Sequence, residues 1–350
     1  MRHLLALLAL ACLPLSTLAA APDDLLYSRF GRYLEALRVQ AGIPGMVATV
    51  VGDSDVVWER TFGYQNQERS VGMLADTPFH LDQLTQVVTA TLVLQCVERG
   101  VVDLDAPIGN FASDSSEPGS TVGQILAHVR PGPGGSQTYA HEPSRYDQLH
   151  KVVRHCTGDS YRESVANLFD RLAMRDSVPG VDAPALAAPA EGVPTREAAN
   201  RFRRVLERLA TSYVLQNRRP LASPHPSATL TASSGIVSTA RDLAKLDVAL
   251  KHGILLAPET LAAAWSVPED SVPERPHGLG WFVQVVDGEV VVWQFGASPV
   301  SSSFMMSLPA RRLTMILLAN SSGLVEPFVL APGDVTASPF ARVFLGLASP

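Results

Sequence analysis

The first part of the chain changes from a helical to a strand-like pattern of apolar residues. Between residues 25 and 40 the apolar side chains recur at helical spacing: Leu26, Phe30, Tyr33, Leu34 and Leu37. The Gly- and Pro-containing segment 42–45 ends this predicted helix. Residues 46–51 and 56–62 then predict two strands, joined by a turn at 52–55.

The middle of the chain predicts helices separated by Pro- and Gly-rich connections. The expected helices cover residues 86–99, 146–156, 161–172 and 196–215. The last of them carries four arginines, Arg201, Arg203, Arg204 and Arg208, which we interpret as a solvated face. Residues 131–135 predict a loop, and the Ala/Pro-rich residues 181–194 predict a surface connection.

The last third returns to a strand pattern. The expected strands cover residues 279–285, 289–295, 302–308 and 313–319, the last a continuous apolar run typical of a buried strand. Strands at both ends with helices between them predict an α+β fold, with a central antiparallel sheet completed by both termini and flanked by helices. We expect the sheet part at about 22–82 and 230–345, and an inserted helical part at about 83–229.

The first 21 residues have the three-part pattern of a secretory signal peptide. A positively charged start is followed by the apolar run from Leu4 to Leu15 and by small residues up to Ala21. This run is too short to span a bilayer, and no later segment is apolar enough to do so. We therefore expect an exported protein, periplasmic or secreted, whose mature domain covers residues 22–350 without a membrane span.

Composition and charge exclude some functions. The chain has 350 residues, of which 46% are hydrophobic and 18% charged, and a net charge of -6. No basic field favours nucleic acid.

After removal of the signal peptide Cys96 and Cys156 remain; export permits a disulfide, but two buried thiols in helices are the favoured interpretation. His150 and His155 fall on different faces of one predicted helix, so neither a metal site nor a cofactor is expected.

Residues 79–91, Phe-His-Leu-Asp-Gln-Leu-Thr-Gln-Val-Val-Thr-Ala-Thr, carry the most specific motif of the chain. The segment resembles the nucleophile segment of the serine β-lactamase-like superfamily, which includes class C β-lactamases, D-alanyl-D-alanine peptidases and esterases. The usual form is Phe-x-Ile-Gly-Ser-x-Ser-Lys-x-x-Thr-Ala. In this chain Gln83 stands at the nucleophile position and Gln86 at the lysine position.

Other segments carry the same resemblance along nearly the whole mature chain. They are 43–45, 63–64, 77–79, 104–108, 124–128, 157–161, 172–174, 234–244 and 277–281. The closest is Ser-Gly-Ile-Val-Ser-Thr-Ala-Arg-Asp-Leu-Ala at 234–244, which resembles Gly-Gly-Leu-x-Ser-Thr-Ala-x-Asp-Leu. The resemblance implies the β-lactamase/transpeptidase-like fold.

The resemblance also implies a chemistry that this chain lacks the groups to perform. A serine attacks a carbonyl with help from a lysine one helical turn on, and backbone N–H groups of the nucleophile and of a late strand hold the oxyanion. Gln83 offers no usable nucleophile, and Gln86 is neutral. On the late strand Gln294 replaces the usual histidine, whereas Gly296 is retained.

The Tyr-x-Asn motif of the family has two alternative alignments here. In one, Tyr139 is retained and His141 takes the asparagine position; in the other, His141 takes the tyrosine position and Pro143 the asparagine position. Either way the asparagine is lost. The sequence leaves both alignments open.

These losses together predict a pseudoenzyme that binds without acylation. We expect a ligand cleft lined by Gln83, Gln86, Tyr139, His141, Gln294 and Gly296. Its expected partner is a cell-wall peptide or glycan; alternatively, the mature protein acts through its surface on another exported protein. The alternative function is an active serine hydrolase (β-lactamase, peptidase or esterase) with a non-standard nucleophile, for which Ser234, Ser298 and Ser301 to Ser303 are candidates and His141 a candidate base.

Overall fold

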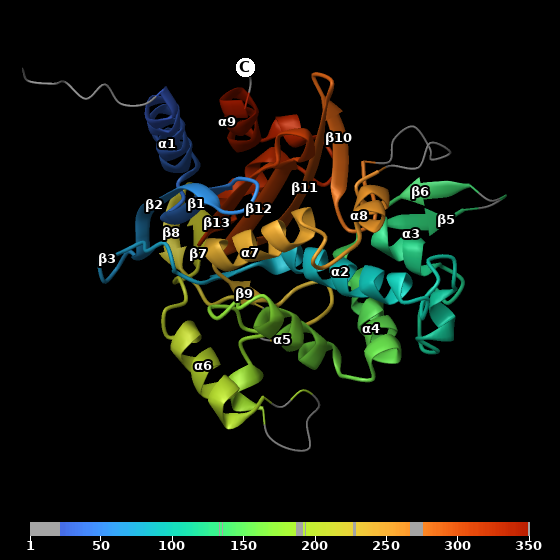
Figure 1. The fold of residues 1–350 in the computed structure, drawn as a ribbon. Coiled ribbons are helices and arrows are strands. Elements are labelled where there is room, and N and C mark those ends of the chain that lie inside the picture. Colours follow the sequence, from blue (N-terminus) through green and yellow to red (C-terminus); the bar gives the residue numbers. More distant parts are fainter. Residues whose placement is uncertain are drawn as a thin grey trace, which may run out of the picture.

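The computed structural model describes residues 22–132, 134, 136–186, 192, 194–226, 229–266 and 276–348. The predicted signal peptide therefore lies outside the described residues. The core element is a seven-stranded antiparallel sheet with the order β10-β11-β12-β13-β1-β2-β3 (Figure 1). Its strands are β1 Gly45–Val51, β2 Val56–Asn66, β3 Val71–Gly72, β10 Phe282–Val286, β11 Glu289–Ser298, β12 Ser301–Leu308 and β13 Leu313–Ala319.

Strands from the two ends of the chain pair in the middle of this sheet. Met46 of β1 lies opposite Ala319 of β13, and Val51 lies opposite Thr314. Each of these strands is predicted by the sequence, and the expectation of one antiparallel sheet completed by both termini is confirmed. The fold is α+β and β-lactamase/transpeptidase-like.

Both faces of the sheet are covered by helices. Met46, Ala48 and Val50 of β1 point to the face that packs against α1 (Pro22–Ala41) and α9 (Pro339–Ala348). Alternate residues of a strand point to opposite faces. Val47 and Val51 accordingly join the second core on the other face. Figure 1 shows α1 and α9 on one side of the sheet and α7 on the other.

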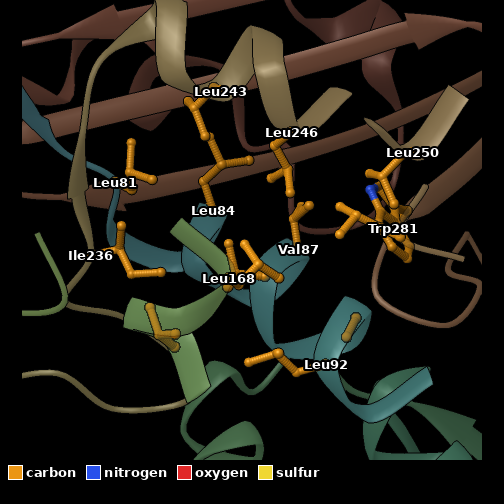
Figure 2. Packing of buried hydrophobic residues seen from close by; sticks show 14 of the residues in the cluster. Leu81, Leu84, Val87, Leu92, Leu168, Ile236, Leu243, Leu246, Leu250 and Trp281 are labelled. Atoms are coloured by element: carbon orange, nitrogen blue, oxygen red, sulfur yellow. The ribbon is translucent and has the colours of Figure 1, made fainter. Parts of the chain in front are cut away.

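The second core surrounds helix α2 (Thr85–Glu98), which follows the short 3₁₀ helix η1 (Asp82–Leu84). Leu84 and Val87 pack near Leu243 and Leu246 of α7 (Ala240–Lys251), and Leu168 of α5 (Tyr161–Arg171) lies on the opposite side (Figure 2). Nearly every residue of α2 is buried. Helix α2, which directly follows the nucleophile position in η1, is therefore held by packing along nearly its whole length.

The remaining elements are α3 Val122–Leu126, α4 Leu149–Thr157, α6 Arg196–Leu206, α8 Pro258–Ala264, β4 Phe79–His80, β5 Val129–Pro131, β6 Gln137–Tyr139, β7 Tyr213–Gln216, β8 Arg219–Ala222 and β9 Val237–Ser238. Among them, Figure 1 shows α4 and α6 below α2, α3, α8, β5 and β6 beside one end of α2, and β7 and β8 near β1 and β2. The 3₁₀ helix η4 (Pro143–Gln148) leads into α4. The division at residue 83 into sheet and helical parts stays a prediction.

One predicted helix is shorter than expected. The helix expected at 196–215 ends at Leu206, and Tyr213 begins strand β7, which pairs with β8. The backbone leaves the helix because tertiary partners take its donors: the Ala210 N–H bonds to the Pro78 carbonyl and the Tyr213 N–H to the Asn320 carbonyl. Arg208 consequently lies outside the helix, where it pairs with Asp76 at 2.7 Å.

Cys96 and Cys156 form a disulfide, so the favoured interpretation of two free thiols is wrong. Cys96 lies on α2 and Cys156 on α4, with their Cα atoms 6.0 Å apart. Periodicity placed each cysteine on a helix, but only the packing of α4 on α2 brings them together. Among the described residues no helix is long and apolar enough to cross a membrane.

Candidate functional site

Gln83, at the nucleophile position, belongs to η1 and lies where η1 contacts strand β11. The contact is close because Gly296 has no side chain: a Cβ atom there would lie 2.1 Å from the Leu81 carbonyl oxygen and 2.8 Å from the Gln83 nitrogen. Any larger residue would push the strand away from η1. Gly296 therefore sets the distance between the nucleophile position and the late strand.

Gln83 uses this closeness to bond to the strand. Its side-chain Oε1 accepts a hydrogen bond from the backbone N–H of Ala297 at 2.7 Å. Ala297 directly follows Gly296 on the late strand, whose backbone N–H holds the oxyanion in the resembling enzymes. The Ala297 N–H is thus already bonded to a side chain of the protein itself.

Gln86 is completely buried one helical turn further on. Its Oε1 lies 3.1 Å from Nε2 of His128, and its Nε2 has no hydrogen-bond partner among the described residues. A neutral amide thus stands where the family places an ammonium group.

His128, which contacts this amide, belongs to a cluster of three histidine rings. The ring centroid of His128 lies 4.7 Å from that of His141 and 4.8 Å from that of His277. Burial lowers the pKa of His141 to about 4 and that of His277 to about 3, and burial with the neighbouring His277 holds the pKa of His128 well below its usual range. All three rings are therefore neutral at pH 7.

Gln294 of strand β11 is the last member of this cluster of polar side chains. Its Nε2 donates to the Gly280 carbonyl at 3.2 Å and lies 3.5 Å from Nε2 of His277, and its Oε1 accepts the Phe295 N–H at 2.9 Å. We name Gln86, His128, His141, His277 and Gln294 the histidine–glutamine centre. The centre holds no charged group at neutral pH, so it can neither activate a hydroxyl as a charged base does nor stabilise an anion by charge.

The structure separates the two candidates for the tyrosine position. Tyr139 points away from the centre and donates its O–H to the Ala331 carbonyl at 2.9 Å, and burial raises its pKa. The ring of His141 instead packs between His128 and Phe295. Of the two candidates, His141 therefore joins the histidine–glutamine centre, and Tyr139 does not line it.

Asp82 forms a network that the sequence did not reveal. The usual motif has glycine at this position, and Asp82 has a left-handed φ of 50°, which only glycine adopts without cost. Its carboxylate is buried and accepts from Nε2 of His225 at 2.9 Å and from Oγ of Ser301 at 2.6 Å. The aspartate in a glycine position was the signal that could have indicated this network.

Two more side chains extend this network. The ring of His80 stacks on that of His225 with centroids 3.7 Å apart and an angle of 10°. Oγ of Ser298 lies 2.8 Å from Oγ of Ser301. We name Asp82, His225, Ser301, Ser298 and His80 the Asp82 network. Unlike the histidine–glutamine centre, it contains a buried carboxylate whose two oxygens both have partners.

The other candidate serines form structural hydrogen bonds. Ser302 donates to the Ser321 carbonyl and Ser303 to the Leu81 carbonyl, each at 2.6 Å. Ser234 lies in a turn, where its N–H bonds to Oγ1 of Thr231 at 3.1 Å. Across the described ranges no group of three or more His, Cys, Asp or Glu side chains is arranged to hold a metal ion.

Fold and site together define a protein built on an acyl-transfer scaffold with an amide at its nucleophile position. Residues 30–334 match the model of the Beta-lactamase family, and the chain belongs to that family.

Two curated relatives match shorter segments. Esterase EstB of Burkholderia gladioli is 33% identical over 102 residues, 27% of this chain and 26% of the esterase. Penicillin-binding protein 4 of Amycolatopsis lactamdurans is 32% identical over 101 residues, 27% of this chain and 26% of that protein. The matches thus span about a quarter of these relatives.

Solved structures resemble the chain over most of its length. The octameric penicillin-binding protein homologue from Pyrococcus abyssi has a TM-score of 0.73 at 20% identity, covering 91% of this chain and 77% of that one. A class C β-lactamase from Rhodobacter sphaeroides has a TM-score of 0.68 at 17% identity, covering 91% and 97%. These likenesses show the fold.

Proposed function

We propose that this protein is an exported, catalytically inactive member of the β-lactamase family that acts by binding. The observation that carries the proposal is the hydrogen bond from the Ala297 N–H to Oε1 of Gln83 at 2.7 Å. A single side chain thereby removes the nucleophile and takes the donor that a substrate carbonyl would need.

The neighbouring positions support the same conclusion. Acyl transfer needs a base to take the proton of the nucleophile. Gln86 cannot accept that proton, and His128 and His277 are buried and have strongly lowered pKa values. Loss of one member of a catalytic unit already removes most of the rate, so further losses follow without additional cost.

The binding role would fall to the cleft that we expect beside Gln83. Gln83 is half-buried and exposes part of an amide, which can donate to a ligand through its Nε2. We propose a cell-wall peptide or glycan as the ligand, with export by the predicted signal peptide bringing the protein to it. The esterase and the penicillin-binding protein among its relatives fit a peptide-like or acyl-containing ligand.

Covalent probes test the inactivity. The purified mature protein is incubated with a fluorescent penicillin, a fluorophosphonate and a chromogenic ester, beside an active class C β-lactamase as control. We expect no labelling and no turnover above the buffer rate. Labelling that disappears when one serine is mutated would overturn the proposal.

The Asp82 network favours one specific alternative, an active hydrolase with Ser298 as nucleophile. Ser298 contacts Ser301, and Ser301 donates to the Asp82 carboxylate, so a proton could pass from Ser298 towards Asp82. Ser298 is next to Ala297 on β11, whose N–H could hold an oxyanion after Gln83 moves away. In this case the fluorophosphonate labels the parent protein but not Ser298→Ala, whereas Ser234→Ala is labelled like the parent.

A further inference from the structure

We propose that the pocket beside the Asp82 network binds an uncharged saccharide, independently of the cleft at Gln83. The pocket has a volume of about 480 Å³ and is lined by His80 and His225 together with residues of the segments 206–212 and 222–224. It lies between the end of α6 and strand β8, and none of its lining residues belongs to the histidine–glutamine centre. The proposal does not rest on the inactivity argued above.

His80 is the polar group in this pocket that is available to a ligand. Its relative exposure is 8%, and its ring lines the pocket while stacking on that of His225. A ligand hydroxyl in the pocket can either donate to or accept from the imidazole.

The Asp82 network fixes the floor of the pocket. Asp82 holds Nε2 of His225 at 2.9 Å, and His225 in turn stacks on His80 at 3.7 Å. Both rings are thereby oriented before a ligand arrives, which reduces the entropy lost on binding. The left-handed backbone of Asp82 is retained although it costs free energy, and such strain gathers at functional sites.

The lining decides the class of ligand. Leu206, Leu209 and Pro224 offer apolar surface, and Thr211, Ser212 and Ser223 carry hydroxyl groups. No Lys, Arg, Asp or Glu belongs to the described lining. Burial and the neighbouring His225 lower the pKa of His80 to about 3, so its ring is neutral at pH 7. An anionic ligand would find no cation, and the Asp82 carboxylate behind His225 would repel it.

A sugar ring fits these requirements. It presents an apolar face to the leucines and the proline, and hydroxyl groups at its edge to His80 and the serine and threonine side chains. A pocket of about 480 Å³ has room for one or two such rings.

Binding is measured by calorimetry with N-acetylglucosamine as the probe, and glucosamine, glucuronate and acetylalaninamide as cationic, anionic and peptide-like comparisons. We expect millimolar binding of N-acetylglucosamine, in keeping with a small ligand, and at least fivefold weaker binding of the other three. Tighter binding of acetylalaninamide would mean that the pocket takes peptides and that the saccharide proposal is wrong. No detectable heat of binding for N-acetylglucosamine at the highest soluble concentration would also overturn the proposal.

Variants locate the site. His80→Phe keeps the ring and its stacking but removes both nitrogens, and we expect about tenfold weaker binding. His80→Gln keeps a donor and an acceptor and should lose less. His252→Ala, at an exposed histidine that contacts Asp53, is the matched control and should bind like the parent.

Gln83→Ala separates this pocket from the cleft. This change removes the hydrogen bond between Gln83 and Ala297, and neither residue lines the pocket. We therefore expect the affinity of the variant for N-acetylglucosamine to stay within about twofold of the parent. If His80→Phe binds like the parent while Gln83→Ala loses binding, the sugar occupies the cleft and the pocket proposal fails.

Discussion

The two polar groups on either side of Gln83 have opposite character. The histidine–glutamine centre is neutral and leaves Nε2 of Gln86, Nδ1 of His128 and Nε2 of His141 without partners among the described residues. The Asp82 network has a buried carboxylate with a partner for each oxygen. Both contain a non-glycine residue with left-handed backbone, His128 at 52° and Asp82 at 50°.

This difference teaches how burial treats neutral and charged groups. In the histidine–glutamine centre the polar atoms are only partly satisfied, which is tolerable because neutral groups cost less to bury than charges. In the Asp82 network both oxygens of the buried carboxylate have partners. The first pattern fits the proposed loss of acyl transfer, and the second fits the proposed binding pocket beside Asp82.

The largest expected effect comes from returning a charge to the histidine–glutamine centre. Gln86→Lys buries an ammonium group among three neutral histidines without a carboxylate, and we expect a loss of about 3–5 kcal/mol in the free energy of unfolding at pH 7. The deficit should shrink as the pH rises, because the burial lowers the pKa of the lysine. Urea denaturation measures it.

Gln40→Lys on the exposed side of α1 is the control, expected within about 0.5 kcal/mol of the parent. Gln83→Ser combined with Gln86→Lys should restore little ester hydrolysis, because Gln294 and His141 remain. A Gln86→Lys variant as stable as the parent would mean that the centre can still neutralise a charge.

The next largest effect concerns the Asp82 network. Asp82→Ala removes the partner of His225 and Ser301 while keeping the strained backbone, and we expect a loss of about 3 kcal/mol in the free energy of unfolding. Asp82→Gly loses the same bonds but accepts the left-handed φ, so it should be about 1 kcal/mol more stable than Asp82→Ala. Equal stability of the two variants would show that the backbone there is unstrained.

Acid should destabilise the centre through its histidines. His141 has a pKa lowered to about 4 against an ordinary 6.5, so between these values the unfolded chain binds a proton that the folded chain does not. The free energy of unfolding therefore falls with falling pH, by about 1.4 kcal/mol per pH unit for each such histidine. His277 extends this window down to about 3.

The slope of stability against pH measures this effect. His141→Gln should reduce the slope between pH 6 and 4.5 by close to one proton, whereas Gln40→Lys, which adds no group that titrates in this range, should leave it unchanged. An unchanged slope in His141→Gln would mean that the His141 ring is solvated in the folded protein.

The smallest effect is expected at the border between the two groups. Gln83→Ala removes one hydrogen bond of a half-buried side chain, and we expect a loss of about 1 kcal/mol. The same change frees the Ala297 N–H, so an acceptor ligand such as benzoate should bind to the variant more tightly than to the parent. Equal binding would mean that Gln83 does not block this donor.

The sequence by itself determined the fold and the identity of the residues at the catalytic positions. Strand and helix patterns depend on the local period of apolar residues, and an ordered series of motifs places Gln83, Gln86 and Gln294 without coordinates. The pattern failed at residues 207–215, where backbone donors are taken by distant carbonyls rather than by the helix.

Only the tertiary structure decided which side chains meet. The Cys96–Cys156 bond joins positions 60 residues apart, and Asp82 meets His225 across 143 residues. The alternatives Tyr139 and His141 are two residues apart, yet one bonds to Ala331 and the other packs on His128. Partners of this kind depend on packing between elements, which no local period along a chain records.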